Sequence, residues 1–323
     1  MKIGVLGAGH LGKVHIKLLK EIPEFDLIGF FDIDKETSDY VSHTFGIKAY
    51  ESRQALITDS DAIDIVTPTP THYECAQAAI KAGKHIFIEK PLTFTVNESE
   101  DLIKLVKEAQ IVAQVGHVER FNPAFLSVKE IINKPQYIEA ERYAIYNTRG
   151  VDVPVVLDLM IHDLDIILST IKSPIKRVSA SGMAIISDTV DIANAQLEFL
   201  NGSVANLSVS RIAIKNTRKI KFIQKDAFIH VDFLNKTSEK YSIATVGESK
   251  AKRRIPLAIE KGKPEKEIII EKPQVILNNA IADELIAFYK SITTNTPLIV
   301  SLEDGHDAML IAYQILEKIN NKL

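Results

Sequence analysis

Three residues of this 323-residue sequence stand out as groups that could do chemistry. Asp158 and His162 lie four positions apart in the apolar segment VVLDLMIHDLDIILSTI, and Lys90 ends the run HIFIEK. A helix would place Asp158 and His162 on one face. His162, with an ordinary pKa of about 6.5, could take a proton from an alcohol while Lys90 stabilises the developing alkoxide. The alternative is a buried His–Asp pair that only satisfies its own hydrogen bonds.

A second candidate site is a glycine-rich turn near the N-terminus. It consists of Gly7, Ala8, Gly9, His10, Leu11 and Gly12. The turn follows a predicted strand and opens a predicted helix, where such glycines allow a tight turn and a close approach to a pyrophosphate. Asp32, twenty positions after Gly12, is placed to accept hydrogen bonds from ribose hydroxyls. Because Asp32 would repel a 2′-phosphate and Ile33 is not an arginine, the sequence favours NAD over NADP.

Two loops complete the predicted cofactor site. TPTPTH at 67–72 and EKP at 89–91 each follow a predicted parallel strand, at the strand ends where open α/β sheets bind ligands. The cofactor contacts predicted there are Thr67, Pro68, Thr69, His72, Glu89 and Lys90. By itself, a lysine at a strand end is most often a solvated surface charge.

The elements that must hold these residues follow from the hydrophobic pattern. Up to residue 120, short apolar runs alternate with helical periodicity, which predicts an α/β Rossmann domain with a doubly wound parallel sheet, and Asn97 is a predicted helix N-cap. Residues 121–323 predict an α+β domain for substrate binding and oligomerisation, with an open, largely antiparallel sheet. In that domain we expect a helix at about 122–133, a helix over 155–171 and a hairpin at Asn201-Gly202, with positive φ at both turn residues.

Composition excludes several classes of protein. Apolar residues make up 46% and charged residues 25%, and 39 Lys+Arg against 42 Asp+Glu give a net charge of -3. We therefore expect neither nucleic acid nor a membrane as a partner. The single cysteine, Cys75, and the lack of a secretory signal predict a cytoplasmic enzyme. No pair of histidines has metal-ligand spacing, so no metal site is expected.

These motifs, in this order and spacing, resemble the glucose-fructose oxidoreductase / inositol dehydrogenase (Gfo/Idh/MocA) family. The matching pieces are GAGHLG, Asp32, TPTPTH, FIEKPL and the D-x-x-x-H segment from Asp158 to His162. The resemblance implies NAD(P)-dependent oxidation or reduction at a carbon of a sugar or polyol. It also implies that Lys90 orients the reacting hydroxyl, that His162 accepts and donates the proton, and that Asp158 contacts the substrate or the lysine.

Within that family the chain is similar to the group that oxidises the 3-hydroxyl of UDP-N-acetylglucosamine. The segments that carry this similarity are VGHVERFNPA at 115–124, DVPVVLDLMIHDLD at 152–165 and DIANAQLEFLNGSVANLSVSR at 191–211. SRIAIKNTRKI at 210–220 departs from that group's tryptophan-containing segment, but Lys215 and Arg218 remain at places suited to a diphosphate. Arg120 and Asn122 are further candidate substrate residues. Arg120 would hold a phosphate or carboxylate, or form an interdomain ion pair with Glu119.

Other readings of the whole protein stay open from the sequence. A redox-neutral glycosidase or epimerase would oxidise and re-reduce its substrate on one bound NAD. A regulatory protein would sense a dinucleotide or sugar without turnover. The exposed face of the second sheet is expected to be apolar or mixed, and it predicts a homodimer or homotetramer formed through that sheet.

Overall fold

A computed structural model describes residues 1–147, 153–248, 253–257 and 265–321. The chain divides into two compact units. The first contains Met1–Phe121 and Asn279–Leu310, and the second contains Asn122–Asn278 and Ile311–Leu323. The sequence predicts one boundary, between residues 120 and 121, and the structure adds two further crossings, after 278 and after 310.

The first unit is built on a parallel sheet of five strands, in the order β2-β1-β3-β4-β5. Its strands are β1 (Lys2–Leu6), β2 (Asp26–Phe31), β3 (Ala62–Ile65), β4 (His85–Glu89) and β5 (Ala113–Gly116). Its helices are α1 (His10–Glu21), α2 (Lys35–Phe45), α3 (Arg53–Asp59), α4 (His72–Lys81), α5 (Val96–Ala109) and α8 (Ala280–Thr294), and α9 (Leu302–Asn320) begins in it. The doubly wound Rossmann sheet is confirmed.

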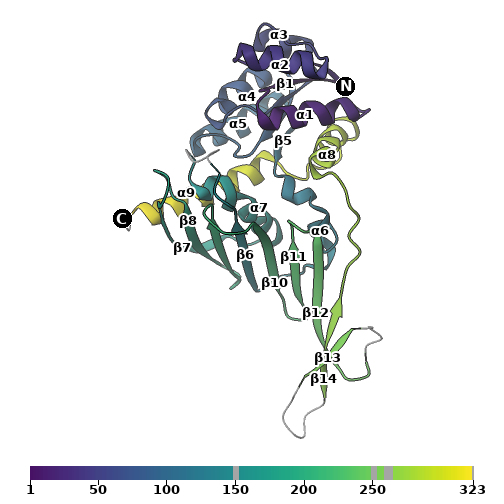
Figure 1. The fold of residues 1–323 in the computed structure, drawn as a ribbon, viewed down its shortest axis with the longest axis vertical. Coiled ribbons are helices and arrows are strands. Elements are labelled where there is room, and N and C mark those ends of the chain that lie inside the picture. Colours follow the sequence, from purple (N-terminus) through teal and green to yellow (C-terminus); the bar gives the residue numbers. More distant parts are fainter. Residues whose placement is uncertain (148–152, 249–252, 258–264, 322–323) are drawn as a thin grey trace. The chain divides into compact units, whose positions relative to one another are not determined.

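The core of the first unit draws on both ends of its sequence. Leu285 and Phe288 of α8 are fully buried with Ile16 of α1 and Phe87 of β4, and the Phe87 and Phe288 rings lie 6.0 Å apart. Figure 1 shows α8 beside α1. The five-stranded sheet is therefore covered in part by a helix that comes more than 150 residues after its last strand.

One predicted helix start is wrong by two residues. The N-cap of α5 is Thr95, whose hydroxyl accepts from the Glu98 backbone while the Glu98 carboxylate accepts from the Thr95 backbone. Asn97 lies inside the helix. A threonine followed three residues later by a glutamate satisfies two helix-end donors at once, so this capping box sets the start of the helix.

The second unit contains a nine-stranded sheet, in the order β13-β14-β12-β11-β10-β6-β9-β8-β7. Its strands are β6 (Tyr137–Tyr143), β7 (Ile175–Met183), β8 (Ile192–Phe199), β9 (Val204–Ser210), β10 (Thr217–Ile223), β11 (Phe228–Asp232), β12 (Thr237–Thr245), β13 (Arg254–Leu257) and β14 (Lys266–Glu271). Every pairing is antiparallel except that of β6 with β9. The largely antiparallel sheet is confirmed.

Two local predictions in this unit are wrong. The helix expected at 122–133 is only α6 (Pro123–Leu126) and a 3₁₀ turn, η3 (Lys129–Ile131). In the hairpin, Gly202 has φ +85°, but Asn201 does not have positive φ. The Gly202 N–H donates to the Phe199 carbonyl, which closes a three-residue loop with one left-handed glycine in place of a two-residue turn.

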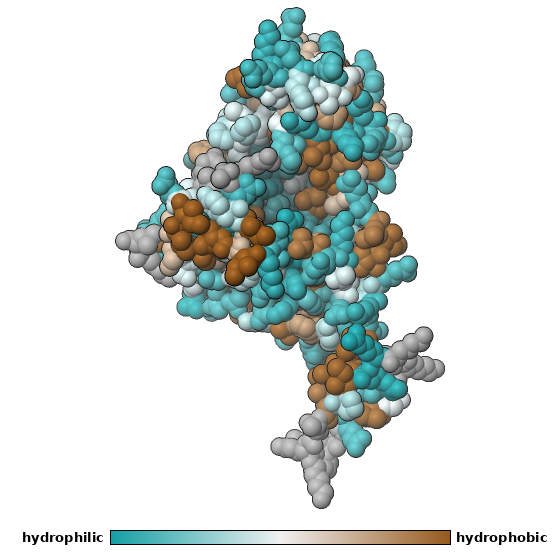
Figure 2. Space-filling model, in the orientation of Figure 1, coloured by the Kyte–Doolittle hydropathy of each residue, from teal (hydrophilic) through white to brown (hydrophobic). Residues whose placement is uncertain are grey.

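The sequence GESKAKRRIPLAIEKGKPEKE at 247–267 is rich in charged residues and is typical of an exposed loop. Within it, Arg254–Leu257 form β13, an edge strand of this sheet. Figure 2 shows apolar side chains over the β13–β14 pair, and Ile243, Val246 and Ile255 are exposed. A substrate lid here would involve residues 249–252 and 258–264, which lie outside the described residues. In the part of the chain that the structure describes, no helix is long and apolar enough to cross a membrane.

Candidate functional site

The glycine turn between β1 and α1 has the geometry that its sequence predicts. Gly7 has φ +94°, and a Cβ there would lie 2.7 Å from the Val66 carbonyl oxygen. A Cβ on Gly12 would lie 2.1 Å from the Gly7 carbonyl oxygen. The backbone itself therefore requires glycine at both positions.

Gly9 differs from the other two glycines. Apart from Gly9 itself, its two chain neighbours and the adjoining backbone of its own helix, no atom of the described residues lies within 4 Å of where its Cβ would be. Gly9 is the N-cap of α1 and has no side chain that could cap the helix, and the first turn of α1 has no acidic residue. Open space at an uncapped helix N-terminus suits an anion, because the free N–H groups and the helix dipole both favour negative charge. The turn fits the pyrophosphate of a dinucleotide.

Asp32 joins the end of β2 to this turn. One carboxylate oxygen accepts from the Ala8 N–H at 2.6 Å and the other from the Asp34 N–H at 2.9 Å. Each oxygen has a second lone pair, so the carboxylate can still accept from ribose hydroxyls.

Beside the turn lies a cavity of about 420 Å³, within the size range of small-ligand sites. It is lined by Leu6, Gly7, Phe31, Asp32, Ile33, Arg53, Thr67, Pro68, Thr71, Glu74 and Cys75. Arg53 is a finding of the structure, because the sequence offered no arginine near Asp32.

His72 holds the two predicted cofactor loops together from inside. It is buried, and its ring nitrogens lie 2.8 Å from the Thr67 carbonyl oxygen and 2.9 Å from the Pro91 carbonyl oxygen. Burial lowers the pKa of His72 despite these carbonyls. Both ring nitrogens of His72 therefore face backbone carbonyl oxygens. His72 would affect a bound cofactor indirectly, by fixing the positions of Thr67 and Lys90.

Lys90 follows β4 directly and is half-buried. Its N–H points at the Glu89 carboxylate, 3.3 Å away. Glu89 is 8% exposed and lies against Gly116, where a Cβ would come within 2.7 Å of a Glu89 carboxylate oxygen. The carboxylate that precedes Lys90 is therefore fixed by its surroundings.

Behind Glu89 lies a group that we call the buried carboxyl cluster: His15, Asp64, Glu89 and Glu284. The His15 Nδ1 lies 2.9 Å from Asp64 Oδ2, and its Nε2 lies 3.3 Å from Glu89 Oε1. His15, Asp64 and Glu284 are fully buried. Within the described ranges, neither carboxylate oxygen of Glu284 has a hydrogen-bond partner.

Burial and mutual attraction shift the pKa values of this cluster. Burial works to lower the pKa of His15, but the charges of Asp64 and Glu89 outweigh it and raise that pKa well above 6.5. Burial raises the pKa of Asp64, against the attraction of His15. Burial and the neighbouring carboxylates raise the pKa of Glu284 well above 4.5, which favours its neutral form.

In the second unit, Asp158 and His162 lie in one continuous helical segment. Asp158 is in a π-helical turn, η4 (Val156–Met160), and His162 is in the first turn of α7 (Ile161–Thr170). Both side chains are half-buried. The helix predicted over 155–171 is confirmed, with an added π turn of a kind that often occurs at functional sites.

Arg142 of β6 anchors this helix. Its guanidinium forms a forked ion pair with Asp163, with N–O distances of 2.8 to 3.1 Å, and both side chains are 3% exposed. Asp163 directly follows His162, so the ion pair fixes the helix turn that carries the candidate base.

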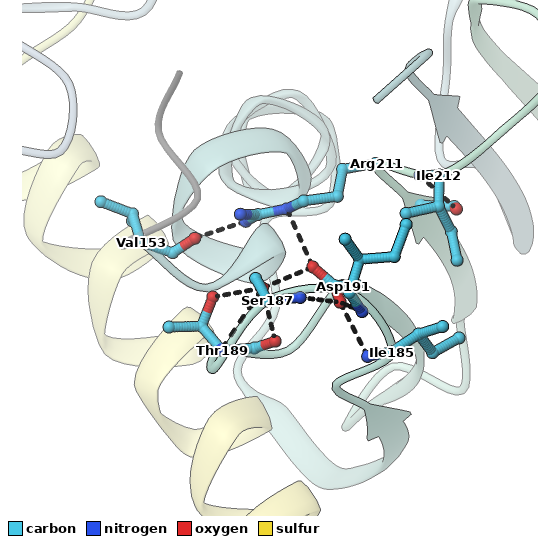
Figure 3. A network of polar contacts seen from close by, with 9 residues as sticks. Val153, Ile185, Ser187, Thr189, Asp191, Arg211 and Ile212 are labelled. Carbon is cyan, nitrogen blue, oxygen red and sulfur yellow. Dashed lines mark hydrogen bonds and ion pairs between the residues drawn. The ribbon is translucent and has the colours of Figure 1, made fainter. Parts of the chain in front are cut away.

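A second group of polar contacts holds the chain just before this helix, at Val153 (Figure 3). We call it the Asp191 cluster; it consists of Val153, Ile185, Ser187, Asp191 and Arg211. The Asp191 carboxylate accepts from three consecutive N–H groups, those of residues 185–187, at 2.7, 2.7 and 3.0 Å, and from the Ser187 hydroxyl at 2.6 Å. Arg211 Nε lies 3.8 Å from Asp191, and the guanidinium also donates to the Val153 carbonyl. The Asp191 cluster thereby holds the segment that leads into η4.

Burial would raise the pKa of Asp191, but these donors outweigh it and hold the pKa far below its usual range. The Asp191 carboxylate is therefore charged at neutral pH.

The remaining predicted substrate residues fall into two groups. Buried Arg120 contacts Asp304 and the Ile299 carbonyl at 3.4 Å, and buried Asn122 caps α6 through the Ala124 N–H and donates to the Phe233 carbonyl. Lys215 and Arg218 are exposed. Arg218 pairs with Arg142 in the β6–β10 register, so it lies on the same face of the sheet as the residue that anchors α7.

Residues 1–117 match the oxidoreductase family with NAD-binding Rossmann fold, and residues 135–229 match the GFO/IDH/MocA C-terminal domain. UDP-N-acetylglucosamine 3-dehydrogenase of Acidithiobacillus ferrooxidans is 38% identical over 242 residues, 75% of this chain and 77% of that enzyme. The chain belongs to the Gfo/Idh/MocA oxidoreductase family. It is an enzyme, an NAD(P)-dependent dehydrogenase acting on a CH–OH group.

Two further similarities extend over the whole chain. Myo-inositol 2-dehydrogenase of Thermotoga maritima is 25% identical over 341 residues, 100% of this chain and 97% of that enzyme. A solved structure of the Acidithiobacillus ferrooxidans enzyme has a TM-score of 0.88 and 32% identity, and the match covers 99% of this chain and 97% of that one. The Gfo/Idh/MocA assignment therefore holds for both units.

The sequence contained signals for some of the residues that it did not single out. Arg142 stands at an inward-facing position of the alternating strand YIEAERY, and Asp163 stands in an apolar helix, so two buried opposite charges could have been paired. Glu284 gave no such signal, since it looks like any helical glutamate. Metal binding finds no support in the described residues, where no group of three His, Cys, Asp or Glu side chains could hold an ion.

Proposed function

We propose that this protein is an NAD-dependent dehydrogenase that oxidises a secondary hydroxyl of a nucleotide sugar, with the 3-hydroxyl of UDP-N-acetylglucosamine as its substrate group. The observation that carries the proposal is the similarity to the Acidithiobacillus ferrooxidans enzyme of that name, with a TM-score of 0.88 over 99% of this chain. The inositol dehydrogenase is equally complete in coverage but only 25% identical.

In the proposed reaction, the hydroxyl carbon loses a hydride and the oxygen loses a proton, so that a ketone forms. Bound NAD would accept the hydride. His162 takes the hydroxyl proton, and Lys90 stabilises the negative charge that develops on the oxygen. Asp158 contacts the substrate. Arg142 and the Asp191 cluster keep the helix that carries His162 in place. The His162 ring is therefore held in a fixed position toward the substrate hydroxyl before the substrate binds.

The proposed cofactor contacts are backbone groups and Asp32. Residues 7–12 would receive the pyrophosphate at the N-terminus of α1, and Asp32 would bind the adenosine ribose. Lys215 and Arg218, exposed at and near the start of β10, would bind the substrate diphosphate.

The test is the appearance of reduced nicotinamide when the protein and NAD are mixed with UDP-N-acetylglucosamine and a carbonyl trap. UDP-glucose and myo-inositol serve as comparison substrates. His162→Ala should lower turnover about 10²- to 10⁴-fold, the usual contribution of a general base, and leave NAD affinity unchanged. His43→Ala, which removes an exposed histidine of α2, is the matched control. Turnover by His162→Ala equal to that of the control would refute the role of His162.

We also propose that the chain forms a homo-oligomer through the open face of its nine-stranded sheet. Over β6, β7, β8 and β9 that face is polar, with a hollow of about 510 Å³ among tyrosine, serine, asparagine and glutamine side chains. Within this hollow, the Asn206 side chain accepts from the Gln196 amide and donates to the Tyr137 hydroxyl. Over β10, β11, β12 and β14 the same face carries apolar side chains, among them Ile223, Phe228, Tyr241, Ile243 and Ile268. The face as a whole is therefore mixed, as the sequence predicts. Light scattering of the purified protein tests this proposal, and a monomer would contradict it.

A further inference from the structure

Arg53 places a positive charge in the cavity beside Asp32. It is the first residue of α3, which starts after the Ser52 cap, and it lines the same 420 Å³ cavity as Gly7 and Asp32. The side chain is 32% exposed, so the guanidinium is accessible from that cavity. In dinucleotide-binding folds, an arginine near the acidic residue of β2 is the group that accommodates a 2′-phosphate.

The guanidinium already has partners. One nitrogen lies 2.6 Å from the Glu74 carboxylate and another lies 3.6 Å from the Cys75 sulfur. Burial raises the pKa of the Cys75 thiol, so the sulfur faces Arg53 as a neutral atom. The charge of Arg53 is therefore offset by Glu74, which lines the cavity too.

The balance of charge in the cavity follows from these contacts. Its charged lining residues are two carboxylates, Asp32 and Glu74, and one guanidinium, Arg53. A ribose 2′-hydroxyl can donate to Asp32 at no electrostatic cost. A phosphate monoester, with a charge of roughly −1.5 to −2, would face both carboxylates and would have to compete with Glu74 for the arginine.

We propose that Glu74 is a specificity-determining residue: by occupying Arg53 it makes the cavity reject a 2′-phosphate, so that the protein binds NAD and holds a latent site for NADP. The proposal rests on the proposed function only in that the cavity receives the adenosine half of the dinucleotide. It adds a second device to Asp32, because Asp32 repels the phosphate directly whereas Glu74 removes the group that would attract it.

The experiment measures binding of NADH and NADPH to the full-length protein by nicotinamide fluorescence. The chain has no tryptophan, so the signal carries no tryptophan background. Glu74→Gln frees Arg53 and should tighten NADPH about tenfold while changing NADH less than twofold. In the double variant Glu74→Gln/Arg53→Met the gain should disappear. Both side chains are at least 32% exposed, so the variants should fold, which thermal melting checks.

Glu51→Gln is the matched control. Glu51 is an exposed acid two residues before Arg53 and does not line the cavity, so its loss removes the same charge without freeing the guanidinium. A Glu51→Gln variant with the same NADPH gain would overturn the proposal, since net charge would then explain the result. Calorimetry with adenosine 2′,5′-bisphosphate and ADP repeats the comparison without the nicotinamide half.

Other results also decide the matter. Equal NADPH affinity in Glu74→Gln and Glu74→Gln/Arg53→Met overturns the proposal, as does a wild type that binds NADPH as tightly as NADH. Equal weakening of NADH and NADPH by Arg53→Met would assign Arg53 to the adenine and would likewise overturn it. These binding measurements need no sugar. An absence of turnover with sugars therefore bears on the proposed function alone, and a wild type that binds neither dinucleotide overturns both.

Discussion

Each unit of the protein buries a group of charged side chains, and the two groups differ in how completely their hydrogen bonds form. Asp191 has four donors within 3.0 Å and a nearby arginine. In the buried carboxyl cluster His15 lies against two acids, but in the described part of the chain both oxygens of Glu284 and one of Asp64 have no hydrogen bond.

The direction of the pKa shifts follows this difference. The pKa of Asp191 is far below its ordinary value because donors outweigh burial, whereas the pKa values of Asp64 and Glu284 are raised because burial dominates. Asp191 therefore stabilises its unit at neutral pH, and Glu284 destabilises its own. Incompletely paired buried acids persist most often near functional sites, and the residue after Glu89 is Lys90. The fully hydrogen-bonded Asp191 cluster thus adjoins the helix of Asp158 and His162, and the incompletely hydrogen-bonded carboxyl cluster adjoins Lys90.

The largest expected effect is the loss of the Asp191 charge. In Asp191→Asn the amide oxygen can still accept from the three backbone N–H groups, but the N–H₂ then replaces the oxygen that accepts from the Ser187 hydroxyl and lies nearest Arg211. Arg211 is left buried beside a neutral group. We expect the free energy of unfolding in urea to fall by about 3 kcal/mol, the usual cost of breaking a buried charge-assisted network. Asp188→Asn, an exposed acid in the same loop, is the control. Equal stability of the two variants would show that the Asp191 donors contribute nothing.

An intermediate effect is expected from His15. His15→Gln leaves Asp64 and Glu89 as buried acids without a cation, and we expect a loss of about 2 kcal/mol in the free energy of unfolding at pH 7. Adding Asp64→Asn should recover part of the loss, because it removes one of the uncompensated charges. A double variant less stable than His15→Gln would contradict the account of this cluster as a group with too many acids.

Much of the Rossmann unit could be predicted because local sequence decides it. All of its strands except the edge strand β2 are almost wholly buried and read as apolar runs, and most of its helices are long enough for periodicity to show. Helix α3 escaped notice because RQALITD has seven residues and buries only Leu56 and Ile57. In the second unit, the parallel pairing of β6 with β9 joins strands more than 60 residues apart. No local pattern encodes such a pairing.

The residues of the candidate site also divide into those that local sequence predicts and those that only the fold brings together. Backbone geometry fixes Gly7, Gly12 and Asp32, and their spacing in the sequence was enough to predict the turn. Arg53 and Glu74 meet only through the fold, 21 residues apart and on different helices. The sequence therefore predicts Asp32 in the cavity beside the glycine turn but neither Arg53 nor Glu74. That Asp158 and His162 share one helix face stays a prediction, since a π turn precedes α7.

The smallest effect at neutral pH, and the most diagnostic in sign, is expected from Glu284→Gln. The raised pKa of Glu284 means that the folded protein binds a proton which the unfolded chain releases above about pH 4.5. Its contribution to stability is therefore present below that pH and declines as the pH rises toward the folded pKa. Glutamine cannot titrate. The variant should come closest to the wild type near pH 5, and its free energy of unfolding should exceed that of the wild type by an amount that grows as the pH rises to 8.

Urea unfolding of both proteins at several pH values measures this gap, and Asp283→Asn on the same helix controls for the loss of an acid. The raised pKa of His15 acts in the same direction in both proteins, since its contribution is complete below pH 6.5 and is lost as the pH rises through the folded pKa. Only the difference between the two proteins reports on Glu284. A gap that does not grow with pH would mean that Glu284 is ionised in the fold, and the contrast with Asp191 would then lie in hydrogen bonding alone.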